Sequence, residues 1–432
     1  MKLWQLIRGG NLNLYFFYLV IFCLPISRKL FTISLWPWIL TWFLEGQYKI
    51  KLSSSYILRN KMPLIFLLGS YILLFISLIW TDNKEAGLNK IGIESSLFLF
   101  PVFLGLNNSR YLEKQSQQRI LISFVAGTII ISLFLLFRSL FFSISYDKGH
   151  LSFYPIVNHV ENIFFYSNFS YIIHPTYFGM MVLFAAAICL MDIKYKFLAE
   201  KFNAVKIILA LFLLLQIFLI SSRAIMMALI ILMVWITITF LYRKKILLTL
   251  AIIFTIIAGL LFIYNPRVNY LISTYDQSGS GELESLNERV IIWGVAFRLV
   301  EKNLLLGLGV GDVQDKLEVG YADYGYKFDT VLNCHNQFIE QWLSSGLAGL
   351  LLLLAGLIIP IFKLGPRTRA FYICFIIVTV CAFMFESTLN RLWGVAFFSI
   401  FYTLLTSKNL NYNHEPKPAK NLKTLRGSKS NL

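Results

Sequence analysis

Long apolar runs with almost no charge recur along the whole chain, and they leave few folds open to it. The chain has 432 residues, of which 57% are hydrophobic and 14% are charged, and its mean hydropathy is +0.68. A run of about 20 apolar residues is long enough to cross a bilayer as a helix. In a bilayer a helix satisfies its own backbone hydrogen bonds. We therefore predict an all-α polytopic membrane protein.

The apolar runs predict about twelve membrane-spanning helices. We place them at 12–27, 30–45, 62–80, 90–106, 120–144, 173–191, 206–221, 224–241, 246–264, 337–362, 370–386 and 391–406. We assign residues 1–406 to a single membrane domain. Residues 407–432 are polar and rich in lysine and have no apolar period, so we expect a disordered basic tail.

The net charge of +17 is distributed unevenly between the two sides of such a bundle. Twelve spans place both termini on one side, and that side holds 25 of the 39 Lys and Arg residues but only 5 of the 22 Asp and Glu residues. Because basic loops are retained in the cytoplasm, we predict cytoplasmic N- and C-termini. Topology and anionic lipid headgroups explain the basic surplus, so no nucleic-acid partner is expected.

The longest extracytoplasmic loop, residues 265–334, is expected to carry function, because loops of 70 residues are uncommon inside compact proteins. Its segment 284–302 has apolar residues at helical spacing, which predicts an amphipathic helix at the membrane interface. The run Gly307–Asp312 is similar to a nucleotide-binding glycine loop, but it follows a helix and not a strand. We interpret it as a tight turn that lets the backbone approach another element closely.

Three charged or titratable residues at the outer face are candidates for chemistry. Arg223 lies between the seventh and eighth predicted spans, and Arg289 opens the predicted loop helix. Two permanently charged, planar guanidinium groups suit a diphosphate, although a snorkelling or solvated arginine is the plainer interpretation. His335 closes the long loop. Histidine is the usual general base near neutral pH, although a lone histidine is more often structural.

Four further residues are candidates for substrate binding. Asn336 could orient His335 or bind a sugar hydroxyl, and His174 is either a helix-start residue or a pocket ligand. Tyr324 and Tyr326 could stack on sugar rings or belong to an interfacial aromatic belt. We expect the two arginines and His335 to line one outward-facing cavity.

Glu386 and Arg391 flank the last outer turn, where we interpret them as an ion pair. The five cysteines are scattered, mostly within apolar segments, and their spacing fits neither a zinc site nor a disulfide framework. We therefore predict no metal site.

Three segments, in this order, resemble the O-antigen ligase and polymerase superfamily of bacterial inner-membrane glycosyltransferases. They are SSRAIMMALIILMVW, NERVIIWGVAFRLVEKNLLLGLGVGD and HNQFIEQWLSSGLAGLLLLLAGL. The similarity is strongest over residues 210–362, and the twelve-span layout extends it over nearly the whole chain. The ordered set is specific for the superfamily but not for one activity within it. The resemblance implies a GT-C-like membrane fold, an undecaprenyl-pyrophosphate-linked glycan donor, and no metal or cofactor.

By this resemblance, Arg223 and Arg289 bind the donor pyrophosphate, and His335 activates the acceptor hydroxyl or positions the donor. Simple chemistry agrees, because two fixed cations can stabilise a pyrophosphate leaving group without a metal. A base then takes the proton of the acceptor hydroxyl.

Two activities within the superfamily stay open. A ligase of lipopolysaccharide biosynthesis transfers the glycan to lipid A-core. A polymerase joins one lipid-linked repeat of O-antigen, capsule or exopolysaccharide to another. We favour the ligase. A polysaccharide transporter is the competing class. Transporters show internal repeats and polar residues near the bilayer midplane. We find no repeat here, and the polar candidates gather at the outer face.

Overall fold

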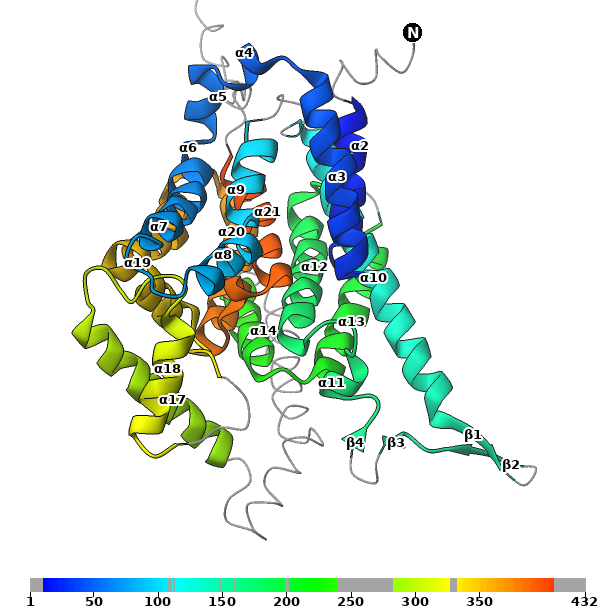
Figure 1. The fold of residues 1–432 in the computed structure, drawn as a ribbon. Coiled ribbons are helices and arrows are strands. Elements are labelled where there is room, and N and C mark those ends of the chain that lie inside the picture. The colour runs from blue at the N-terminus through cyan, green and yellow to red at the C-terminus, as the bar shows by residue number, and fades with distance from the viewer. Residues whose placement is uncertain are drawn as a thin grey trace, which may run out of the picture.

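The fold is a bundle of helices, as the apolar runs predict (Figure 1). The computed structural model describes residues 11–106, 111, 113–147, 150–157, 161–198, 202–238, 283–326 and 332–407. The predicted span 246–264 and the predicted tail from residue 408 onward lie outside these residues. The described exceptions to an all-helical fold are two short antiparallel hairpins, β1 (Ile144–Asp147) with β2 (His150–Phe153) and β3 (Ile156–Val157) with β4 (Glu161–Asn162).

Each predicted span that falls in the described residues overlaps helical structure, and all except 90–106 follow one helix or one continuous helical run. Five helices are long and apolar enough to cross a membrane alone: α10 (Lys114–Ser143), α12 (Pro175–Tyr195), α13 (Asn203–Ile220), α19 (Gln337–Lys363) and α20 (Pro366–Phe385). The others are α2 (Asn11–Cys23), α3 (Arg28–Glu45), α6 (Lys61–Pro63) continued by η1 (Leu64–Leu68) and α7 (Gly69–Ser77), α14 (Arg223–Ile236) and α21 (Leu392–Thr406). These lengths confirm a polytopic membrane protein, while the total of twelve crossings stays a prediction.

The predicted span 90–106 is wrong as a single straight helix. A helix starts earlier, at α8 (Lys84–Ile93), and meets α9 (Ser96–Leu99) and η2 (Phe100–Leu104) at a bend of 48°. The Asn83 side chain caps α8 by accepting from the Ala86 amide at 3.1 Å. Hydropathy misplaced this start because charged residues interrupt the apolar pattern over the first turns of α8.

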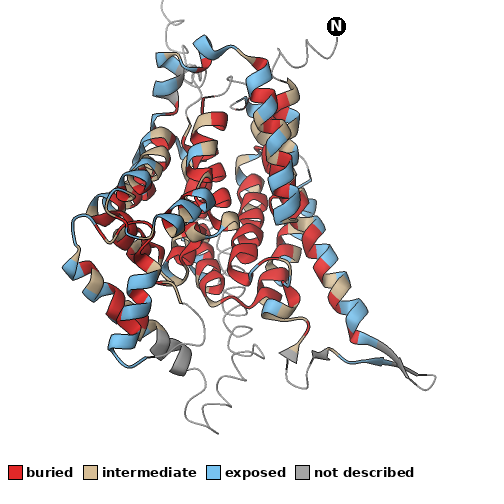
Figure 2. Cartoon of the chain, viewed as in Figure 1, coloured by how far each residue is buried: buried red, intermediate tan, exposed pale blue. Residues whose placement is uncertain are grey.

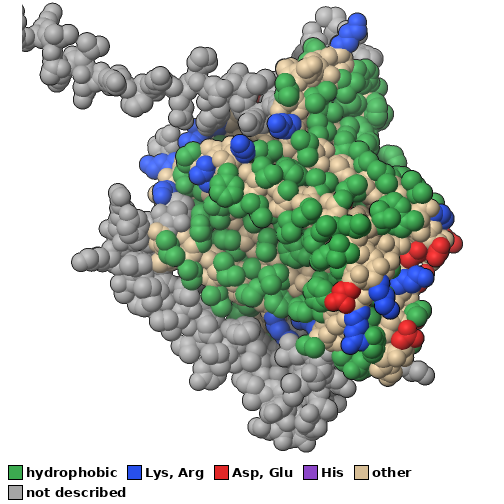
Figure 3. Space-filling view, turned by 90° about the vertical axis from the view of Figure 1, so that its left-hand side faces the viewer, with side chains coloured by type: hydrophobic (Ala, Val, Ile, Leu, Met, Phe, Trp, Pro, Cys, Tyr) green, Lys and Arg blue, Asp and Glu red, His purple; other side chains and the backbone are tan. Residues whose placement is uncertain are grey.

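The helices of the predicted long loop and the two β hairpins lie at the same end of the bundle. Figure 1 shows α17 (Leu283–Lys302), α18 (Val313–Asp323) and the β hairpins at the lower end, opposite the N-terminus, α4 (Tyr48–Lys51) and α5 (Ser54–Arg59). On the face drawn in Figure 3, a broad apolar band separates basic side chains at the upper end from mixed charges at the lower end. This pattern fits a bundle that crosses a membrane from top to bottom.

Helix α12 forms the centre of the bundle. Of its most apolar window, 89% is buried inside the protein, and Figure 2 shows it almost entirely in the buried colour. Phe184 packs on Phe401 of α21 with ring centroids 4.9 Å apart, and Phe124 of α10 packs on the same ring at 4.7 Å. Aromatic pairs of this kind are worth about 1 kcal/mol each beyond burial, so they fix α12 against its neighbours.

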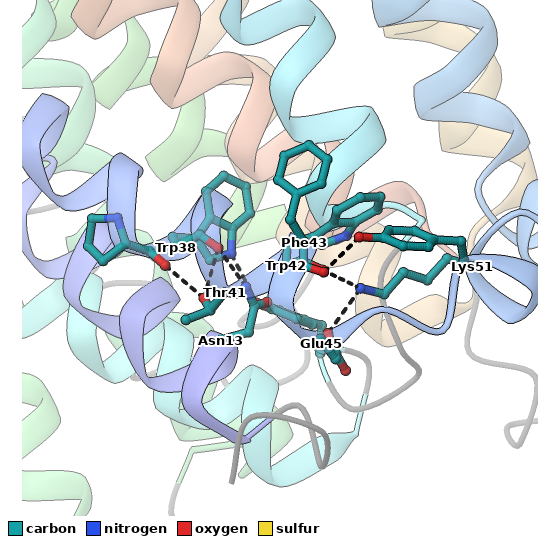
Figure 4. Close-up of polar contacts among 10 residues, drawn as sticks. Asn13, Trp38, Thr41, Trp42, Phe43, Glu45 and Lys51 are labelled. Carbon is teal, nitrogen blue, oxygen red and sulfur yellow. Dashed lines mark hydrogen bonds and ion pairs between the residues drawn. The ribbon is translucent and has the colours of Figure 1, made fainter. Parts of the chain in front are cut away.

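The α2–α3 hairpin is held by buried polar contacts (Figure 4). Asn13 donates from Nδ2 to the Trp38 carbonyl at 2.7 Å. Lys51, the last residue of α4, ties that helix to the end of α3 by a buried ion pair with Glu45 at 3.1 Å and a hydrogen bond to the Trp42 carbonyl at 2.9 Å. A buried charge of this kind needs its partner, because unpaired it costs several kcal/mol.

The helices of the long loop have a small core of their own. It combines one face of α17, one face of α18 and the start of α19: Ile292, Val295, Ala296, Val300, Val313, Leu317, Tyr321, Cys334, Ile339 and Leu343. The predicted helix 284–302 is thereby confirmed as α17, and its buried face packs on protein. Its insertion into a membrane interface stays a prediction.

The run Gly307–Asp312 anchors this loop to the bundle. The Asp312 carboxylate accepts from the backbone amides of Asp82 and Asn83, each at 2.8 Å, just before α8. A Cβ on Gly309, whose φ is +98°, would overlap the Thr81 side chain. The close backbone approach expected from the sequence is therefore confirmed, and the element approached is the start of α8.

A kink in α19 receives the other side of the same loop. Ser345 and Gly346 depart from helical geometry, and Gly346 has a φ of +69°. The Leu308 amide donates to the Leu343 carbonyl at 2.7 Å, and the Leu347 amide donates to the Leu304 carbonyl at 3.2 Å. Backbone groups of the loop thus form hydrogen bonds with the α19 carbonyl and amide groups that have no helical partner at the kink.

Asp312→Ala should release the loop from α8. The two amides lose a charged acceptor, and each such hydrogen bond is worth about 1.5–3 kcal/mol. We expect a lower melting temperature in detergent and faster proteolysis within residues 265–334. Asp323→Ala, at the exposed end of the same loop helix α18, is the control. Equal effects of the two substitutions would contradict the anchoring role.

Candidate functional site

The Glu386 carboxylate is the centre of a polar cluster at the lower end of the bundle. Glu386 directly follows the last residue of α20. Its Oε2 lies 3.4 Å from Nδ1 of His335, just before α19. The two side chains are 13% and 27% exposed, respectively, so the pair is shielded but open to a substrate. The structure therefore pairs Glu386 with His335, whereas the sequence interpretation paired it with Arg391.

The backbone at His335 is held in an unusual conformation. Its φ is +44°, a left-handed geometry that non-glycine residues adopt at a cost of about 1–3 kcal/mol. The His335 amide donates to Oδ1 of Asn333 at 2.9 Å, which stabilises the turn. Strain of this kind persists where the surrounding structure imposes it, and it is typical of functional sites.

Asn336 has a role that the sequence did not predict. Its Oδ1 caps α19 by accepting from the amides of Phe338 at 2.9 Å and Ile339 at 3.2 Å. Its Nδ2 lies 3.4 Å from the Met384 carbonyl of α20. Asn336 therefore joins the two helices that carry His335 and Glu386, and a contact with sugar stays a prediction.

Two further hydrogen bonds hold the His335 segment from other sides. Gln337 accepts on Oε1 from the Leu389 amide at 2.7 Å, which ties α19 to the 3₁₀ turn η5 (Thr388–Asn390). Trp293 of α17 donates from Nε1 to the Cys334 carbonyl at 3.0 Å. The loop helix that carries Arg289 is thereby fixed to the residue that precedes His335.

Arg289 and His174 face the same carboxylate. Burial raises the pKa of Glu386, but the hydrogen bond from His335 and the charges of His335, His174 and Arg289 outweigh burial and hold the pKa below its ordinary value of 4.5. Arg289 also lies over the Phe385 ring, with Cζ 5.8 Å from the centroid. Three residues predicted from separate segments are thus brought together around Glu386, which the sequence analysis did not predict as a site residue.

Arg223 lies at the same end of the bundle, next to the first turn of α12. His174 is the residue before α12, and Thr176 Oγ1 lies 3.4 Å from Oγ of Ser222. Ser222 directly precedes Arg223, the first residue of α14. The contact between α12 and α14 thus places Arg223 beside the segment that contributes His174. Convergence of both arginines on one cavity stays a prediction.

The two predicted tyrosines lie after α18 and are exposed. Tyr324 is 50% exposed and Tyr326 is 41% exposed. The Arg298 guanidinium covers the Tyr324 ring, with Cζ 4.1 Å from the centroid. One face of Tyr324 is therefore already occupied by a cation, and stacking of either ring on a sugar stays a prediction.

A buried charged cluster adjoins the site along α19. Glu340, one turn after His335, forms an ion pair with Lys90 of α8, and Lys90 also donates to Ser344 at 2.9 Å. Glu94, at the bend between α8 and α9, is 2% exposed. The sequence analysis treated the predicted spans as nearly free of charge, but Lys90, Glu94 and Glu340 are charged residues within them. Charges at membrane depth are costly and are usually functional.

Among the residues that the structure describes, no group of three or more His, Cys, Asp and Glu side chains could hold a metal ion. The five cysteines are free thiols, and all are buried. Burial of all five thiols is typical of small core residues.

A comparison with known protein families matches one segment of the chain, which contains part of the candidate site. Residues 208–354 match the family model described as O-Antigen ligase. No match is found among curated proteins. The matched residues include Arg223, Arg289 and His335, and the match supports the resemblance to the O-antigen ligase and polymerase superfamily.

Proposed function

We propose that this protein is an O-antigen ligase-type glycosyltransferase. It transfers a glycan from undecaprenyl pyrophosphate to a hydroxyl of lipid A-core at the extracytoplasmic face of the bacterial inner membrane. The observation that carries the proposal is the His335–Glu386 pair with Arg289 and His174 around it. Glycan transfer from a pyrophosphate needs a base for the acceptor hydroxyl and a cation for the leaving group. The histidine, oriented by a carboxylate, and the arginine supply these two groups.

His335 acts as the general base in this proposal. Glu386 accepts a hydrogen bond from Nδ1, which leaves Nε2 free to take the proton of the acceptor hydroxyl. The 3.4 Å separation is long for a hydrogen bond, as is common before substrate binds. The ionised carboxylate then stabilises the imidazolium that forms, so Glu386 serves as the positioning residue for the base.

The arginines stabilise the departing group. The acceptor oxygen forms a bond to the anomeric carbon while the bond from that carbon to the pyrophosphate oxygen breaks, and the electron pair leaves with undecaprenyl pyrophosphate. Arg289 and Arg223 offer planar donors to the oxygens where this charge develops. Direct displacement inverts the anomeric centre, and the donor supplies the free energy.

Loss of His335 should abolish transfer. We expect His335→Ala, expressed in a strain that lacks the gene, to reduce glycan transfer by about 10²–10⁴-fold, the usual contribution of a general base. A glycan ladder gel checks this, with an immunoblot to confirm that the variant reaches the membrane at the wild-type level. Polymer that disappears from lipid A-core while lipid-linked polymer accumulates is the expected result.

The same gel distinguishes the two activities of the superfamily. If single repeats remain on the core and only the ladder vanishes, the protein is a polymerase and the ligase proposal fails. An unchanged ladder would contradict both activities on O-antigen.

Arg289→Gln should reduce transfer by about 100-fold or more, because it removes a cation aimed at the leaving group. Arg289→Lys keeps the charge but loses the planar pair of donors, so we expect an intermediate loss. Arg298→Gln on the same helix is the matched control, since Arg298 stacks on Tyr324. The measurement is the rate of glycan transfer in membranes with a lipid-linked donor. Equal losses for Arg289→Gln and Arg298→Gln would refute a specific role for Arg289.

The Glu386 pair should stabilise the fold only above acidic pH. Because the pKa of Glu386 is lowered in the folded protein, its contribution is present above the unfolded value of about 4.5 and is lost as the pH falls through the folded value. Glu386→Gln should therefore lower the melting temperature at pH 7, and the difference from wild type should shrink below about pH 4.5. Glu318→Gln, an exposed carboxylate of α18, is the control. A difference that stays constant with pH would count against the ionised pair.

A further inference from the structure

A groove lies beside α5 and α6, which Figure 1 shows at the upper end of the bundle, opposite the loop helices α17 and α18. It has a volume of about 530 Å³, within the roughly 300–1,000 Å³ of typical ligand sites. It lies between the α5–α6–η1 segment and the last turns of α19, and the end of α21 closes it. The lining residues are Leu58, Lys61, Met62, Ile65, Phe66, Ile359, Lys363 and Thr406.

Two lysines from distant parts of the sequence line this groove. Lys61 begins α6, and Lys363 is the last residue of α19. Both side chains are exposed, and neither forms an ion pair with a carboxylate among the described residues. Two uncompensated ammonium groups on one groove attract a ligand with a negative charge, and a phosphate group suits them.

Apart from Thr406, the rest of the wall is apolar. Ile65 is 49% exposed and Ile359 is 39% exposed, and Ile359 lies one turn before Lys363 on a helix long enough to cross a membrane. Figure 3, which faces α7 and α19, shows basic side chains above a broad apolar band. The groove is therefore cationic at Lys61 and Lys363, and apolar at Ile65 and Ile359, which lie one turn further into the bundle.

We propose that this groove binds one anionic phospholipid of the membrane leaflet at the upper end of the bundle. The headgroup phosphate lies between Lys61 and Lys363, and one acyl chain lies along Ile65 and Ile359. The apolar wall favours a lipid over a soluble anion, and the two unpaired lysines favour an anionic over a zwitterionic headgroup. Basic pockets between membrane helices bind acidic headgroups in this way. The site is separate from the proposed glycan-transfer site.

Native mass spectrometry of the full-length protein in detergent tests the proposal, with phosphatidylglycerol as the probe and phosphatidylcholine for comparison. We expect wild type to retain one phosphatidylglycerol in preference to phosphatidylcholine. Lys61→Gln and Lys363→Gln should each weaken retention about fivefold, as expected for one lysine near an acidic headgroup. Ile359→Trp should weaken it while both charges remain, because the indole fills the groove. Lys114→Gln, at the exposed start of α10, is the matched control and should bind like wild type.

Several results would overturn the proposal. The groove is not a lipid site if the Lys61→Gln/Lys363→Gln double variant, with an unchanged melting temperature, retains phosphatidylglycerol like wild type. The same conclusion follows if Lys114→Gln weakens retention equally, since surface charge alone would then explain binding. Displacement of the lipid by millimolar inorganic phosphate would identify a free-anion site. Equal retention of phosphatidylcholine would show that the lysines do not select the headgroup.

Discussion

The candidate site depends on how the long loop is anchored to the bundle. The Asp312 carboxylate accepts two backbone amides at the start of α8, each at 2.8 Å, and the loop backbone fills the kink of α19 around Gly346. A charged acceptor on two amides is strong and directional, so the loop can hold a fixed position. Without the Asp312 contacts, the loop that carries Arg289 would be held to α19 mainly by the small core that α17 and α18 share with it. The run Gly307–Asp312 therefore holds the loop in place, and glycine is required where its backbone contacts the residues before α8.

Most of the functional groups lie at helix ends, and Arg289, inside α17, is the exception. His335 precedes α19, Glu386 follows α20, His174 precedes α12, and Arg223 begins α14. Polar groups at helix ends can reach water and a substrate headgroup while the apolar helix bodies stay in lipid. The left-handed backbone at His335 and the cap made by Asn336 show how such an end is held. This arrangement suits an enzyme whose donor has its chain in the membrane and its glycan outside.

Hydropathy predicted the helices well because the transfer free energy of a segment depends on its own composition. The loop helix 284–302 appears as α17 over Leu283–Lys302, since its apolar spacing already marks a buried face. The same reasoning missed the bend near Glu94, because a charge within an apolar run has no meaning until its partner is known. The charged neighbours of Glu94 are Lys90, one turn earlier, and Glu340, which α19 brings from a distant part of the sequence.

The sequence by itself determined a helical membrane protein, its uneven charge, the helix of the long loop and the residue types suited to a pyrophosphate. Only the tertiary structure decided that Glu386, and not Asn336, is the side chain that faces the His335 ring. The reason is physical: period and composition record which face of a helix prefers lipid or protein, whereas pairing of single polar groups depends on how helix ends meet in space. The lysine-lined groove has the same origin, because Lys61 and Lys363 meet only through the packing of α6 beside α19.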